Sequence, residues 1–142
     1  MITITIIGED PYSCRDKRVY ELAKDLALET GPDWTAKIIS YNSEEAKKAG
    51  KVGTPKDIAQ WGKLSLPWDK IDDLYKKDWT PELDSLLKPA QEKAEDEGWL
   101  MTPVLMIGEA EHMVIYQGIT LPRVGVQGAI GLFFTSSYKR KK

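Results

Sequence analysis

The first residues of the chain strongly constrain its fold, because residues 2–7 (ITITII) are β-branched throughout. Such side chains favour strands. A short apolar run without alternation is typical of a strand buried on both faces, as in a parallel sheet. Gly8 ends the run. We therefore expect the chain to begin with a central strand of a sheet that is covered on both sides.

The next segment changes to the periodicity of a helix. A loop is expected at residues 8–14 (GEDPYSC), and a helix from Asp16 to the Gly31-Pro32 pair. Its apolar residues lie on one face; they are Val19, Leu22, Ala23, Leu26 and Ala27. Residues 34–40 (WTAKIIS) predict a second strand. This β-α-β unit predicts parallel strands joined by a right-handed crossover.

Residues 43–98 predict a helical insertion of four short helices. Ser43, Thr54-Pro55 and Thr80-Pro81 have the residue types of helix starts. Pro89 is expected to kink or divide the last helix. That helix carries apolar residues at helical spacing, namely Leu83, Leu86, Leu87, Ala90 and Ala94.

The chain then returns to strands. Residues 103–107 (PVLMI) and 112–117 (HMVIYQ) flank a Gly-containing turn and predict a β-hairpin. A final helix is expected at residues 122–136. The whole order predicts a single α/β domain over residues 1–142, with a central mixed four-stranded sheet flanked by helices and the insertion between its two halves.

Two short stretches carry a resemblance to a known family. The first is Pro11-Tyr12-Ser13-Cys14-Arg15, between the first strand and the first helix, and the second is Thr102-Pro103, directly before the third strand. In these stretches and in its element order the chain resembles the thioredoxin and glutaredoxin superfamily. It is also similar to the arsenate reductase and Spx branch, which has a Ser-Cys-Arg junction and a helical insertion. The resemblance implies a thioredoxin-like fold, a redox motif at the loop, and a cis peptide bond before Pro103.

The chain departs from the family motif Cys-x-x-Cys, because Pro11 stands where the first cysteine would be. In the family the first thiol attacks and the second resolves the mixed disulfide. Cys14 takes the second position, so the chain is not expected to reduce disulfides as dithiol relatives do. Three functions remain open. They are an accessory thiol-redox or thiol-carrier role through a mixed disulfide or persulfide at Cys14, a redox-inactive binding or scaffold protein, and a regulator of the Spx type.

Cys14 itself has two interpretations. A thiol in the first turn of a helix, with Arg15, Lys17 and Arg18 nearby, favours the thiolate. The alternative is a small buried hydrophobic residue. A protein partner or a small thiol is the expected ligand of this loop.

Trp61, Trp68 and Trp79 are concentrated in the insertion. They either form an aromatic wall over the loop that recognises a partner, or anchor short helices on the core. We also expect the insertion to fold over or beside Cys14, since both of its ends leave from the same edge of the sheet.

Composition excludes several classes of function. The net charge of −2 argues against a nucleic-acid partner. No apolar run has the length of a membrane span, and the N-terminus lacks the features of a signal peptide. One histidine and one cysteine provide no recognisable metal-ligand cluster, so no metal and no other cofactor is expected. A single cysteine fits a cytoplasmic protein.

Overall fold

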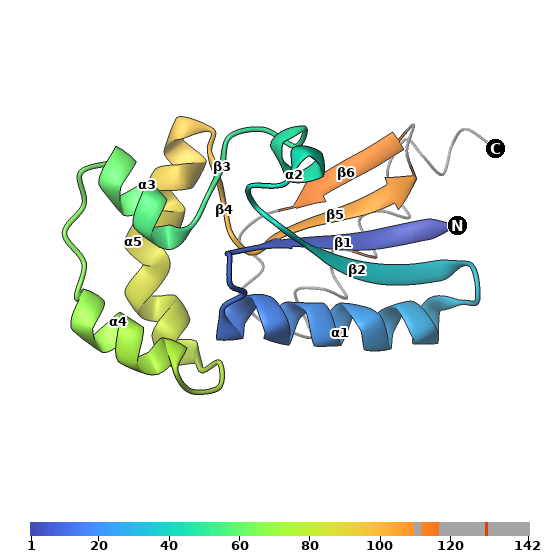
Figure 1. Cartoon of the computed structure of the whole chain (residues 1–142), viewed down its shortest axis with the longest axis horizontal. Coiled ribbons are helices and arrows are strands. Elements are labelled where there is room, and N and C mark those ends of the chain that lie inside the picture. The colour runs from blue at the N-terminus through green and yellow to red at the C-terminus, as the bar shows by residue number, and fades with distance from the viewer. Residues whose placement is uncertain (110–111, 117–129, 131–142) are drawn as a thin grey trace.

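Strand β1 (Ile2–Gly8) lies inside the main sheet of the computed structural model. The structure describes residues 1–109, 112–116 and 130. β1 pairs in parallel with β2 (Trp34–Ser40) and antiparallel with β5 (Val104–Glu109), and β6 (His112–Tyr116) completes the order β2–β1–β5–β6 (Figure 1). The expected α/β class, parallel first pair and hairpin within the same sheet are confirmed.

Alternate residues of β1 face two different cores. Ile4 and Ile6 pack with the apolar face of α1 (Cys14–Thr30), and Ile7 packs with Ala46 of the short helix α2 (Glu44–Lys47). The side chains of Ile4, Ile6 and Ile7 are fully buried. The β-branched run therefore has the two-sided burial that its composition predicts.

The insertion has a core of its own. It consists of α3 (Pro55–Trp61), α4 (Trp68–Tyr75) and α5 (Pro81–Glu97), which lie beyond the carboxyl ends of β1 and β2 (Figure 1). The fully buried members of this core are Ile58, Ile71, Leu83, Leu87, Ala90, Ala94 and Met101. By contrast α2 packs on the main sheet, so the separate body starts at α3 and not at residue 43.

A second, two-stranded sheet connects this body to the rest of the chain. β3 (Val52–Gly53) leads into the insertion, β4 (Leu100–Met101) leads out, and the two pair in parallel. Because β3 pairs with β4, the segment that leads into the insertion and the segment that leads out of it lie side by side. This small sheet was not expected from the sequence.

The helix starts follow the residue types at the expected caps, with one correction. Ser43, Thr54 and Thr80 are N-cap residues. α1, however, begins at Cys14 and not at Asp16, because Ser13 caps it.

α5 is neither short nor divided, since it runs for 17 residues through Pro89. Pro89 is exposed, so the carbonyl that loses its partner faces water while Leu87 and Ala90 hold the helix from its buried side. The helix expected at residues 122–136 lies outside the described residues except for Ile130, which is helical and buried.

We predict that Leu87→Ala destabilises the protein by about 3 kcal/mol, because it removes a fully buried side chain from the insertion core and leaves a cavity. Chemical denaturation measures the loss. Leu28→Ala is the matched control, since Leu28 is 82% exposed and should change stability by less than about 0.5 kcal/mol. Equal effects of the two substitutions would contradict the core assignment.

Candidate functional site

The loop between β1 and α1 is held by the carboxylate of Asp16. Its Oδ2 accepts hydrogen bonds from the backbone N–H groups of Glu9 (2.7 Å) and Ser13 (2.8 Å). The Ser13 hydroxyl oxygen accepts from the Asp16 N–H (3.2 Å), which completes a capping box. A Cβ atom on Gly8 would lie 2.8 Å from Asp16 Cγ, so β1 can end this close to α1 because it ends on glycine. These contacts place Cys14 at the first position of α1.

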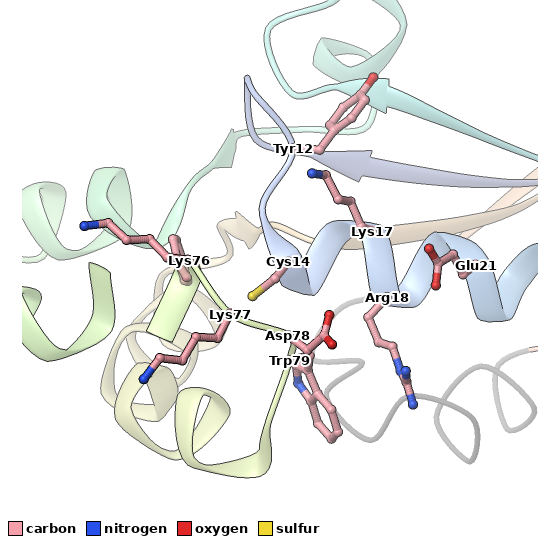
Figure 2. Close-up of a pocket in the computed structure, with 10 residues that line it drawn as sticks. Tyr12, Cys14, Lys17, Arg18, Glu21, Lys76, Lys77, Asp78 and Trp79 are labelled. Atoms are coloured by element: carbon pink, nitrogen blue, oxygen red, sulfur yellow. The ribbon is translucent and has the colours of Figure 1, made fainter. Parts of the chain in front are cut away.

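Cys14 is half-buried and opens into a pocket of about 500 Å³. The pocket is lined by Tyr12 and Cys14, by an exposed side of α1 (Lys17, Arg18 and Glu21), and by residues 75–79. Figure 2 shows Cys14 Sγ directed from α1 toward the segment that joins α4 to α5. The expected position of the insertion beside Cys14 is confirmed.

The Cys14 thiol is not activated by its surroundings. Burial raises the pKa of Cys14, and the nearby Arg15 charge opposes this effect without reversing it. The Arg15 charge and the backbone N–H groups at the helix start do favour the thiolate, as expected, but the desolvation of a half-buried thiol outweighs them, so the net effect is a raised pKa of Cys14.

Arg15 joins the two motif stretches to the insertion. Its guanidinium is almost fully buried, with Nε donating to Asp84 Oδ1 of α5 (2.8 Å) and Nη1 donating to the carbonyl oxygen of Thr102 (3.1 Å). Asp84 Oδ2 accepts a second hydrogen bond from Trp79 Nε1 (2.6 Å). Three segments that are far apart in the sequence thus meet at one side chain.

The remaining motif residues have distinct local geometry. The peptide bond Thr102–Pro103 is cis, and so is Asp10–Pro11. The Tyr12 hydroxyl donates to the carbonyl oxygen of Ile38 in β2 at 3.5 Å. The contact of Arg15 with Thr102 brings the two motif stretches together.

The three tryptophans of the insertion do not form one wall. Trp79 lines the Cys14 pocket. Trp61 instead packs edge-to-face against Trp99 with Lys51 above both rings, and Trp68 packs against the insertion core with Lys56 above it. The alternative interpretation, anchoring of short helices, fits Trp61 and Trp68, whereas Trp79 belongs to the site.

An acidic group with a buried carboxylate oxygen lies beside the loop and was not expected from the sequence. Burial, together with the charge of Asp16, raises the pKa of Glu9 to about 7, although the Tyr75 hydroxyl lowers it in part. Burial also raises the pKa of Asp16, against the backbone N–H groups of Ser13 and Glu9. Burial and the Glu9 charge raise the pKa of Tyr75. Glu9 could have been found from the sequence, because its carboxyl group directly follows a strand that is predicted to be buried on both faces. Nothing in the sequence indicates that Tyr75 belongs to the site.

Comparisons with known proteins assign no family to this arrangement. No protein-family model matches the chain, and no curated protein and no solved structure matches it significantly. The site is therefore interpreted from its own geometry.

The described residues contain no cluster of three or more histidine, cysteine or acidic side chains that could hold a metal ion. Within the same part of the chain, no helix is both long enough and apolar enough to cross a membrane.

We predict that Asp84→Asn destabilises the protein by about 3 kcal/mol, because it leaves the buried Arg15 guanidinium without its counter-charge. Denaturant titration at pH 7 measures the change. Glu82→Gln is the matched control on the same helix, since its ion pair with Lys70 is exposed and contributes less than about 1 kcal/mol. A small effect of Asp84→Asn would mean that Arg15 does not hold the insertion.

Glu9→Gln should change how stability depends on pH. Because the folded-state pKa of Glu9 lies above its ordinary value of 4.5, the folded protein favours the protonated form. Its stabilising contribution is complete at low pH, is lost as the pH rises toward about 7, and stays lost above that. A neutral amide does not titrate, so the stability of Glu9→Gln relative to the parent should rise by about 3 kcal/mol between about pH 5 and pH 8.

Free energies of unfolding measured for both proteins across this pH range provide the test. A difference that is constant with pH would show that Glu9 is ionised in the folded state at neutral pH.

Proposed function

We propose that this chain is a thioredoxin-like protein with an accessory thiol role, in which Cys14 carries one partner as a mixed disulfide. The element order and the strand order β2–β1–β5–β6 support this assignment. So does the position of the Pro11–Arg15 stretch after β1, where Arg15 donates to the carbonyl oxygen of Thr102.

The observation that carries the proposal is the opening of Cys14 into its pocket. A volume of about 500 Å³ falls within the range of small-molecule sites. Cys14 is the one cysteine of the chain, so no second thiol of this protein can displace a bound partner. A partner joined to Cys14 therefore stays until an external thiol attacks.

The raised pKa of Cys14 favours such a carrier over a reductant. In the exchange, the Cys14 thiolate attacks one sulfur of a disulfide, a new S–S bond forms, and the other half leaves as a thiolate that takes up a proton. A thiol of high pKa is a poor leaving group. Attack of an external thiol that expels the Cys14 thiolate is therefore slow. The mixed disulfide at Cys14 persists as a result.

A second candidate function is a binding or scaffold role without redox chemistry. The raised pKa of Cys14 and the proline at position 11 favour this alternative. The two functions differ in whether the native thiol reacts with a disulfide at all.

Incubation with the neutral bis(hydroxyethyl) disulfide, followed by intact-mass spectrometry, tests the proposal. We expect one adduct per chain, absent from Cys14→Ser, at a rate that rises about tenfold per pH unit near neutrality because the thiolate fraction does so. The adduct should remain after the reagent is removed. If the native chain forms no adduct while the denaturant-unfolded chain does, the thiol is inaccessible and the scaffold function is the correct one.

A further inference from the structure

The charge of the Cys14 pocket is opposite in sign to that of the whole chain. Its lining has four cationic side chains, Lys17, Arg18, Lys76 and Lys77, against the two acidic side chains of Glu21 and Asp78. The chain as a whole carries a net charge of −2. Positive charge is thus concentrated around the one thiol of a protein that is otherwise slightly acidic.

These cations come from both sides of the pocket. Figure 2 shows Lys17 and Arg18 extending from α1, and Lys76 and Lys77 extending from the segment after α4. Among the ion pairs between described residues, none involves Lys17, Arg18 or Lys76, while Lys77 contacts Asp73 at 3.5 Å. Within the described residues, the positive charge at the pocket is therefore largely uncompensated by ion pairs.

From this arrangement we propose that the pocket selects small, negatively charged disulfides or thiols as the partners of Cys14. The inference rests on the proposed function and gives it a substrate class. Uncompensated cations around an opening raise the local concentration of anions and speed their encounter with the thiol. The same positive potential disfavours cationic partners of equal size.

Two thiosulfonate reagents of similar size and opposite charge test the selection. These are sulfonatoethyl methanethiosulfonate and trimethylammonioethyl methanethiosulfonate. In each reaction the Cys14 thiolate attacks the sulfenyl sulfur, a disulfide forms, and methanesulfinate leaves. Each rate is divided by the rate of the same reagent with free mercaptoethanol, which removes the intrinsic difference between the reagents.

We expect the normalised rate of the anionic reagent to exceed that of the cationic one about tenfold at low ionic strength. The ratio should approach one in about 0.5 M salt, because exposed charges are screened. The double substitution Lys76→Glu and Lys77→Glu should shift the ratio toward the cationic reagent by tenfold or more. Lys47→Glu with Lys48→Glu makes the same change in net charge on α2, away from the pocket, and should leave the ratio nearly unchanged.

The neutral reagent methyl methanethiosulfonate distinguishes failure of the charge selection from failure of the thiol role of Cys14. If it modifies Cys14 and the charged reagents react equally, the charge selection is wrong while the thiol role stands. If the control pair on α2 shifts the ratio as much as the pocket pair, net charge and not the pocket governs the preference, and the inference fails. If none of the three reagents reacts with the native protein, the proposed function and the selection fail together.

Discussion

The buried guanidinium of Arg15 is the interaction on which the arrangement of this protein depends. It pairs with Asp84 of the insertion and donates to the carbonyl oxygen of Thr102 beside the main sheet. A buried cation with two such partners is costly to separate from either of them. The position of α5 relative to α1, and with it the wall of the Cys14 pocket, therefore depends on one side chain of the motif loop.

Burial and the charge of Asp16 explain why the carboxyl group of Glu9 retains its proton, although the charge of Arg15 opposes this effect. Asp84 takes the ion pair, and the Asp16 carboxylate accepts two backbone N–H groups at the start of α1. Glu9 is the third acid near Arg15 and has no comparable compensation, since its Oε2 is buried without a hydrogen-bond partner among the described residues. Burial raises the pKa of both Asp16 and Glu9, and Glu9 remains largely neutral until about pH 7.

Much of the fold could be predicted from the sequence, because local patterns determine it. The β-branched run of β1, the helical spacing from Val19 to Ala27 and the Thr-Pro pairs at α3 and α5 are each read from adjacent residues. The pairing of β3 with β4 involves only two residues of each strand, which is too short for a recognisable strand pattern in the sequence.

The site was less predictable for a physical reason. Cys14, Arg15 and Thr102 stood out in the motif stretches, but the effect of burial on the thiol pKa depends on neighbours contributed by the insertion. Asp84 and Tyr75 lie about 60 to 70 residues along the chain from the loop that they contact or influence. The exposed face of Pro89, which lets α5 continue, likewise becomes evident only once the helix is packed.

The separation of the insertion core from the cores on the two faces of the main sheet has a consequence for local opening. Units with their own cores unfold and exchange amide hydrogens with some independence. The insertion is coupled to the main sheet through β3, β4 and Arg15. Unfolding of the α3–α5 body therefore breaks contacts of these residues with the rest of the chain. A molecule held between Cys14 and residues 75–79 would bridge the two units. Its binding energy would then add to the coupling between them, and the slowest-exchanging amides of both would become protected together.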